Sequence, residues 1–152
     1  MARWPSPGRC KRRLSCDLNN TLGLSNSSER ATRIQRRLTH HTAAVVRGLA
    51  GAMEMKPVLA VSGLGSRAAT RWGQQLGLGQ VRPQGRGKLG TRLRRQLMHG
   101  HRHNRPCLVI GTDLPELNPD DLSRPLSSWR SMTWCWGQPP MGATGCWGSA
   151  HH

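Results

Sequence analysis

Residues 57–76, PVLAVSGLGSRAATRWGQQL, decide the fold class of this 152-residue chain. Residues 58–62 form a short apolar run between Pro57 and Gly63, which is typical of a buried strand. Residues 67–76 follow at once with a pattern typical of a helix. A strand that leads directly into a helix is the repeating unit of α/β proteins, so this stretch predicts an α/β domain.

Strands and helices continue to alternate on both sides of this unit. Ser27 or Ser28, followed by Glu29, predicts the start of a helix that runs to Gly51. Its apolar face would carry Ile34, Leu38, Val45 and Leu49, and its outer face Arg30, Arg33, Arg36 and Arg37. Downstream, we expect a basic helix at residues 91–99, a buried strand at 107–110, and a helix that Asn118 caps with Pro119 in its first turn. The pattern therefore predicts one domain with a mainly parallel sheet.

Three segments carry no regular period. Residues 1–14 contain two prolines and a glycine before a basic run, so we expect a loop there. Residues 17–28 are rich in Asn, Ser and Leu and predict a connector, and residues 82–90 predict a glycine-rich loop.

Composition limits the compartment and the partners. Residues 1–14 lack the apolar core of a secretory signal, and the sequence holds no run of eighteen apolar residues, so we expect a cytoplasmic protein without a membrane partner. The five cysteines have no zinc-ligand spacing and are expected to be free thiols. The net charge of +16 indicates non-specific polyanion binding, although arginine outnumbers lysine heavily, as GC-rich codons also produce.

The N-terminal segment holds the first candidate binding residues, which are Arg3, Gly8, Lys11 and Arg13. A glycine lets the backbone approach a phosphate closely, and fixed cations beside it neutralise a diphosphate. The alternative is a basic tail in solvent, which the residue types alone favour.

Two further loops are candidates. Asp113, in Gly-Thr-Asp-Leu-Pro, follows the predicted strand 107–110, where open α/β sheets bind ligands and a carboxylate can hold a divalent cation. The alternative is that Asp113 only caps the next turn. Gln84 and Gly85 lie in the loop PQGRGKLGTR, which can present backbone N–H groups to an anion, and a plain turn explains it equally well.

The alternating histidines His99, His101 and His103 are a weaker metal candidate. Alternating side chains on an extended segment can share a metal ion. The neighbouring Arg102 and Arg105 oppose a cation there.

Four motifs in order resemble a family of bacterial glycosyltransferases with the nucleotide-diphospho-sugar transferase (GT-A) fold, described as radical-SAM/selenodomain-associated. The family pattern reads F-A-R-x-P-x-P-G-x-x-K-T-R-L, R-R-L-T-x-H-T, P-Q-G-x-G-D-L-G-x-R and G-T-D-x-P. The matching segments here are residues 2–14, 36–42, 83–92 and 111–115. Two positions depart from the pattern, because Arg12 replaces a threonine and Lys88 replaces an aspartate.

The resemblance implies a partial three-layer α/β sandwich and a nucleotide-sugar or nucleotidyl transferase site. Arg3, Gly8, Lys11 and Arg13 would lie at the diphosphate of the nucleotide or nucleotide-sugar substrate, with Gln84 and Gly85 nearby. Asp113 would hold Mg²⁺ or Mn²⁺. The chain begins where the family's first strand ends, so the resemblance implies that this strand is missing and that residues 1–121 form an incomplete domain.

The C-terminal tail has a separate interpretation. If residues 132–148 are back-translated and each codon starts one base earlier, the reading contains D-V-V-L-G-P-A-x-D-G-G-Y-W-L-L-G, which is the family's next motif. We expect residues 122–152 to be read out of frame after a one-base shift between residues 121 and 132, and to form a poorly ordered tail. The sequence therefore indicates a transferase-like fragment with disabled activity. The alternative is a small basic nucleic-acid-binding protein that uses the arginine-rich helix and the tail tryptophans.

Overall fold

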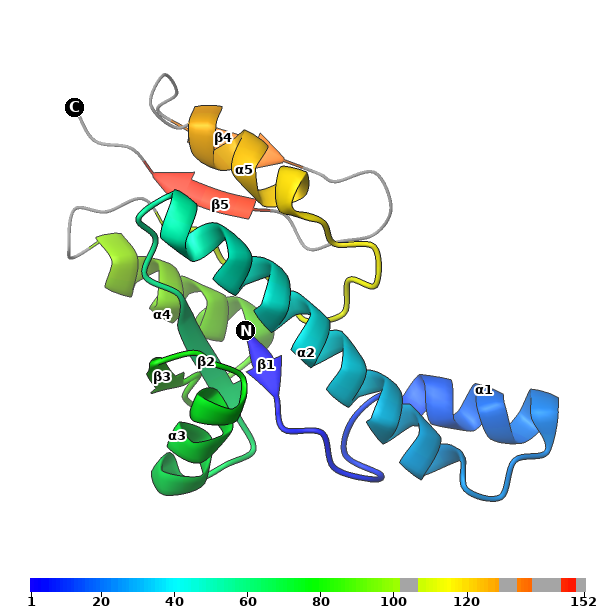
Figure 1. Cartoon of the computed structure of the whole chain (residues 1–152). Coiled ribbons are helices and arrows are strands. Elements are labelled where there is room, and N and C mark those ends of the chain that lie inside the picture. The colour runs from blue at the N-terminus through cyan, green and yellow to red at the C-terminus, as the bar shows by residue number, and fades with distance from the viewer. Residues whose placement is uncertain (102–106, 129–133, 138–145, 150–152) are drawn as a thin grey trace.

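The computed structural model describes residues 1–101, 107–128, 134–137 and 146–149 (Figure 1). The elements in chain order are β1 Ala2–Arg3, α1 Arg12–Leu22, α2 Ser27–Ala52, β2 Val58–Ser62, α3 Ser66–Gln75, β3 Gln80–Pro83, α4 Leu89–His101, α5 Pro119–Ser128, β4 Trp134–Gly137 and β5 Cys146–Ser149.

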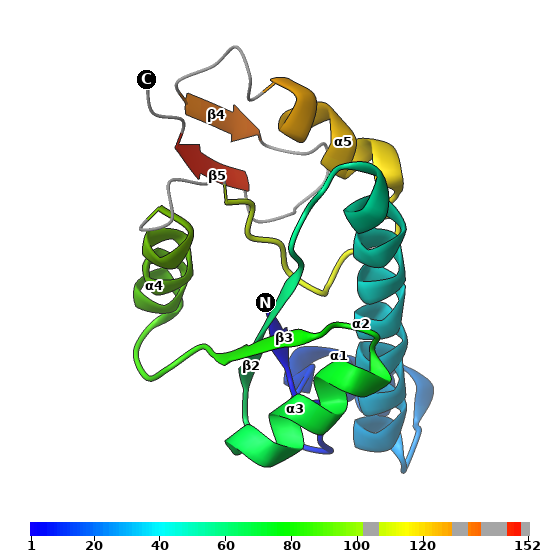
Figure 2. The same ribbon diagram turned by 60° about the vertical axis from the view of Figure 1, so that its left-hand side comes forward.

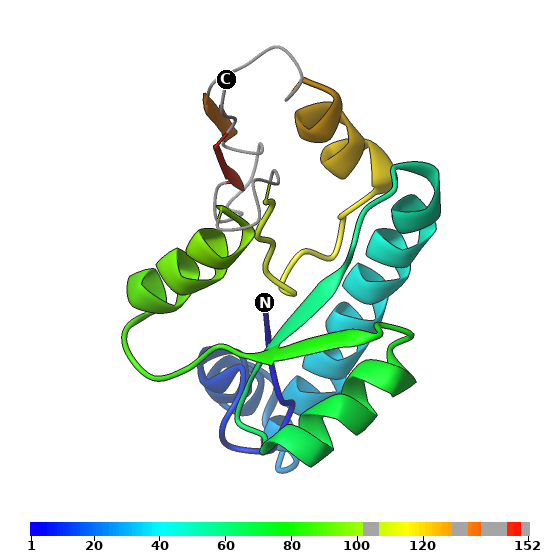
Figure 3. The same ribbon diagram turned by 90° about the vertical axis from the view of Figure 1, so that its left-hand side faces the viewer.

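A parallel three-stranded sheet organises the N-terminal two thirds of the chain. Its strand order is β1-β2-β3, with Ala2 opposite Val61 and Val58 opposite Gln80. Helices α2 and α3 lie on one side of this sheet and α4 lies on the other, as Figures 2 and 3 show. Strands β4 and β5 form a separate antiparallel pair. The prediction of an α/β fold with a mainly parallel sheet is therefore confirmed.

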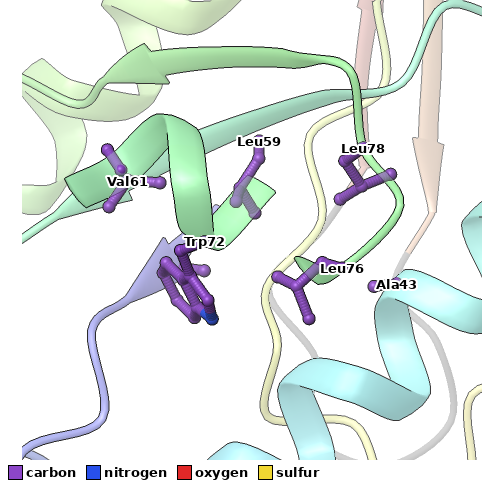
Figure 4. Packing of buried hydrophobic residues seen from close by; sticks show 8 residues of the cluster. Ala43, Leu59, Val61, Trp72, Leu76 and Leu78 are labelled. Atoms are coloured by element: carbon purple, nitrogen blue, oxygen red, sulfur yellow. The ribbon is translucent and has the colours of Figure 1, made fainter. Parts of the chain in front are cut away.

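The core lies between the sheet and the helices α2 and α3 (Figure 4). Leu59 and Val61 alternate along β2 and face Trp72 of α3, while Ala43 closes the cluster from α2. Trp4 packs edge-on against Trp72, with ring centroids 5.1 Å apart. Burying one large apolar side chain stabilises the fold by about 1.5–3 kcal/mol, so this cluster holds the strand ends in fixed positions.

The elements with a clear hydrophobic period are where the sequence predicts them. The predicted strand at residues 58–62 is β2. The predicted helix at residues 67–76 is α3, which is shifted by one residue toward the N-terminus. The predicted basic helix at residues 91–99 is α4, which is longer by two residues at each end. Strong local patterns therefore located these elements correctly.

Four local predictions were wrong. Residues 1–14 are not all loop, because Ala2–Arg3 form β1 beside β2 and α1 begins at Arg12. Residues 17–28 are not a connector, because α1 occupies Arg12–Leu22 and packs on α2. Leu14, Leu18 and Leu22 recur at four-residue steps along this helix, a helical period that the predicted loop and connector overlooked. Residues 82 and 83 are not loop, because β3 ends at Pro83, an edge position where the missing N–H costs no ladder bond. Residues 107–110 form no strand and are only half-buried; the Ile110 carbonyl accepts a hydrogen bond from the Met1 amine beside β1.

Helix α2 buries a face that is rotated from the predicted one, on which Leu38, Val45 and Leu49 are only half-buried. Ile34 is 38% exposed, whereas Gln35, Thr39 and Thr42 are buried with two alanines, Ala31 and Ala43. Small and hydroxyl-bearing side chains let α2 approach its neighbours closely, and their polar atoms find partners there. The predicted N-cap is also wrong, because Asn26 takes that position and Ser27 is the first helical residue. The outer arginines are exposed as predicted.

Helix α5 begins as predicted. Asn118 Oδ1 accepts a hydrogen bond from the Asp121 backbone N–H at 3.1 Å, and Asp121 Oδ2 accepts one from the Asn118 N–H at 3.0 Å. This reciprocal pair satisfies two donors at the helix start. The predicted boundary after residue 121 falls inside this helix, and the out-of-frame reading of residues 122–152 stays a prediction.

Within the described ranges, no helix is both long enough and apolar enough to cross a membrane.

Candidate functional site

A pocket of about 710 Å³ opens at the carboxyl ends of the parallel strands. Its lining includes Arg3 at the end of β1, Ser62 at the end of β2 and Gln84 just after β3. Residues 109–113 complete it from the other side of β1. The strands therefore follow one another outward from β1 to β3, and the chain then returns to the other side of β1. This reversal of strand order is a topological switch point, where open α/β sheets bind ligands.

The N-terminal loop returns to this pocket through a tight turn. The Trp4 N–H donates to the Ser62 carbonyl at 3.0 Å, which extends the β1 ladder by one residue. The Arg9 N–H then donates to the Ser6 carbonyl at 3.1 Å, with Pro7 and Gly8 at the turn positions between them. Gly8 has φ +70°, which the third position of a type II turn requires. The proline and glycine thus reverse the chain and bring residues 9–13 back to the site.

Helix α1 begins at the wall of the pocket. Lys11 precedes it with left-handed backbone angles, φ 49° and ψ 40°, which cost a non-glycine residue about 1 kcal/mol or more. No side chain caps the first turn of α1, and Lys11, Arg12 and Arg13 all line the pocket. The exposed N–H groups and the helix dipole favour an anion at this position, as do the basic side chains.

Asp113 lies at the opposite wall and is already paired. Its Oδ1 is 3.3 Å from the Lys11 Nζ, and its side chain is 63% exposed. Among the described residues that line the pocket it is the only carboxylate. Protein sites usually hold Mg²⁺ with one or two carboxylates and substrate phosphates, but here the single carboxylate faces an ammonium group that a Mg²⁺ or Mn²⁺ ion would have to displace. The cation implied by the resemblance stays a prediction.

Gln84 holds the strands together at the pocket floor. Its Nε2 donates to the Ala2 carbonyl at 2.9 Å and to the Ala60 carbonyl at 3.0 Å, and its Oε1 accepts from Arg92 Nη1 at 3.2 Å. Both amide hydrogens are therefore used by the protein. The side chain fixes β1, β2 and the start of α4 relative to one another, and it presents Arg92 to the pocket.

The two glycines predicted for the site lie at its edge. Gly8 lines a neighbouring hollow of about 440 Å³, which shares Arg3, Arg9 and Arg12 with the main pocket. Gly85 lines neither hollow; its φ of +76° disfavours any side chain, and an added Cβ would also displace the guanidinium of Arg95.

The structure thus brings five of the seven predicted residues into the main pocket, which are Arg3, Lys11, Arg13, Gln84 and Asp113. It also adds three arginines that the prediction left out, Arg9, Arg12 and Arg92. Arg92 ends the glycine-loop motif, so that motif could have identified it. Lys88, the other departure from the family pattern, lies outside both hollows.

Gln35 is a further lining residue that the sequence analysis missed. It is 5% exposed, and its Nε2 donates to Thr112 Oγ1 at 3.2 Å and to Thr39 Oγ1 at 3.4 Å. His41 Nε2 bonds the Leu117 carbonyl at 2.9 Å a little further along α2. The motif at residues 36–42 therefore acts with Gln35 to hold the loop that carries Asp113. The motif itself was the available signal, one residue away from Gln35.

The free-thiol prediction is confirmed for the three cysteines whose side chains the structure describes, whereas no metal cluster supports the histidine prediction among the described residues. His103 lies outside the described residues, and across the described part of the chain no three His, Cys, Asp or Glu side chains gather as a metal site. Cys10, Cys16 and Cys107 are free thiols. Burial raises the pKa of the Cys107 thiol, while the charge of Arg82 lowers it by a smaller amount.

A family model matches residues 36–138, which is more than half of the chain. Its description is an uncharacterized protein conserved in bacteria, DUF2064. The chain belongs to this family. The matched range contains the motifs on α2, after β3 and at Asp113, whereas the N-terminal loop precedes it.

One solved structure gives a fold comparison. It is the crystal structure of a "putative nucleotide-diphospho-sugar transferase" from Desulfovibrio desulfuricans G20, with a TM-score of 0.65 and 13% sequence identity. The match covers 97% of this chain and 60% of that one, so the chain spans about 60% of the length of this neighbour. The likeness shows that the two share a fold. No curated protein matches the sequence.

Proposed function

We propose that this chain binds the diphosphate group of a nucleotide or nucleotide sugar, as the donor-binding part of a sugar or nucleotidyl transferase. The convergence of Arg3, Lys11 and Arg13 at the carboxyl ends of the strands carries the proposal. These residues come from separate positions along a loop that reverses at Gly8, and they meet at the switch point of the sheet. The shared fold with the transferase neighbour supports the same assignment.

The pocket residues would act through charge and position. Fixed guanidinium groups and the start of α1 would hold the diphosphate, and they would stabilise the charge that develops on it as a leaving group. Because these donors are held in place by the turn at Gly8 and by Gln84, little reorganisation would be needed when the charge forms.

We propose that the chain as it stands binds its ligand without completing transfer, because residues after 121 are read out of frame. The shifted reading would restore a D-G-G-Y segment and with it another acidic residue. The genomic DNA provides the test. Sequencing that finds no inserted or deleted base between codons 121 and 132 in related strains would remove this part of the proposal.

Binding can be measured directly by isothermal titration with a panel of nucleoside diphosphates and their sugars. Arg13→Gln removes one charge from the pocket, and Arg37→Gln removes one from the exposed outer face of α2. We expect Arg13→Gln to weaken binding about tenfold or more and Arg37→Gln to change it little. Equal losses in both variants would mean that bulk charge, and not this pocket, binds the ligand.

The exposed arginines of α2 keep a second candidate open, which is binding to nucleic acid. Affinity for a single-stranded oligonucleotide would then fall linearly with the logarithm of salt concentration. Arg37→Gln would reduce that slope, whereas nucleoside diphosphates would not compete. Competition by a nucleoside diphosphate at low concentration would favour the pocket instead.

A further inference from the structure

The residues that line the main pocket carry a large excess of positive charge. Six basic side chains line it, from Arg3, Arg9, Lys11, Arg12, Arg13 and Arg92, against the single carboxylate of Asp113. A divalent cation that enters with a diphosphate would approach all six positive groups, while the diphosphate alone is attracted by them. The balance of charge therefore favours an anion that arrives without a metal ion.

Lys11 occupies the position beside Asp113 that a metal ion would need. Its Nζ is 3.3 Å from Oδ1 and its side chain is 23% exposed, so the ammonium group is partly enclosed by the pocket. The hydroxyl of Thr112, the residue before Asp113, already accepts a hydrogen bond from Gln35. A cation at Asp113 would have to compete with Lys11 and would find few free oxygen ligands.

Arg92 adds a guanidinium group to the wall of the pocket. Its Nη1 donates to Gln84 Oε1 at 3.2 Å, which fixes the position of its positive charge. Its Nε has no hydrogen-bond partner among the described residues, but this atom is shielded from solvent and is therefore not offered to a ligand in the pocket. Arg92 thus contributes to the site through its charge.

We infer that this pocket binds a diphosphate without a divalent cation, with Lys11 and the arginines supplying the neutralising charge that a metal ion would otherwise supply. The inference rests on the proposed function, because it concerns the same pocket. It replaces the metal implied at Asp113, and it assigns Asp113 a different role. The carboxylate pairs with Lys11, competes with the anion for it and lowers the net positive charge of the site.

The test uses inorganic pyrophosphate as the probe, titrated into the full chain by calorimetry with EDTA and then with excess Mg²⁺ or Mn²⁺. We expect binding in EDTA that is as tight as with metal or tighter, because the metal neutralises the probe. Binding that appears only with metal would overturn the inference and leave the proposed function standing. Binding of neither pyrophosphate nor any nucleotide, with or without metal, would overturn the proposed function and the inference with it.

Asp113→Asn separates the two roles of this carboxylate by the sign of its effect. If Asp113 only competes with the anion for Lys11, the variant binds pyrophosphate in EDTA about three- to tenfold more tightly. If Asp113 holds a metal ion, the variant loses the affinity that Mg²⁺ or Mn²⁺ provides. Asp17→Asn is the matched control, because it makes the same charge change on exposed α1 outside the pocket and should leave the affinity nearly unchanged.

Discussion

Replacing Gln84 with leucine should uncouple the strand ends that form the pocket floor. Leucine has a similar size but removes three side-chain hydrogen bonds, to the carbonyls of Ala2 and Ala60 and from Arg92. Gln84 is 4% exposed, so water cannot replace these partners easily. At about 1 kcal/mol for each bond, with an added cost for buried groups left without a partner, we expect a loss of roughly 2–4 kcal/mol.

Urea denaturation gives the free energy of unfolding of Gln84→Leu, and calorimetry gives the shift in melting temperature. For a chain of this size the loss corresponds to a decrease of roughly 5–15 °C. Gln74→Leu is the control, since Gln74 is exposed on α3 and should change stability by about 0.5 kcal/mol or less. A Gln84→Leu variant within about 0.5 kcal/mol of the unchanged chain would refute the assigned role of this side chain.

The other predictions concern α3, the thiols and α5. Gly73→Ala should destabilise the fold by about 1–3 kcal/mol, because the added methyl group meets Val81 and the Leu78 carbonyl; adding Val81→Ala should recover part of this loss in urea denaturation. Iodoacetamide followed by peptide mass spectrometry should label Cys16 well before Cys107, because Cys16 is exposed while burial raises the pKa of Cys107 and keeps it protonated to higher pH; equal rates at neutral pH would contradict this. Asn118→Ala should cost about 1 kcal/mol by removing the cap of α5, and an unchanged urea midpoint would show that the cap contributes nothing.

The candidate site was only partly predictable from sequence. Arg3, Lys11 and Asp113 were identified because glycine, cations and a carboxylate at strand ends carry a chemical pattern. Gln35 carries no such pattern, since a glutamine within a helix is usually exposed. Its role depends on Thr112, which is 77 residues away along the chain. Contacts of this kind become visible only when the chain is folded.

The sequence by itself determined the α/β class, because residues 58–62 and 66–75 have the local periods of a strand and a helix. It also determined the start of α5, because capping is decided by residues three positions apart. The tertiary structure alone decided which face α2 buries, because Gln35 and Thr39 find their partners only where the chain returns past β1. It also decided the pairing of Lys11 with Asp113, because the return of the chain past β1 brings these distant charges together across one pocket.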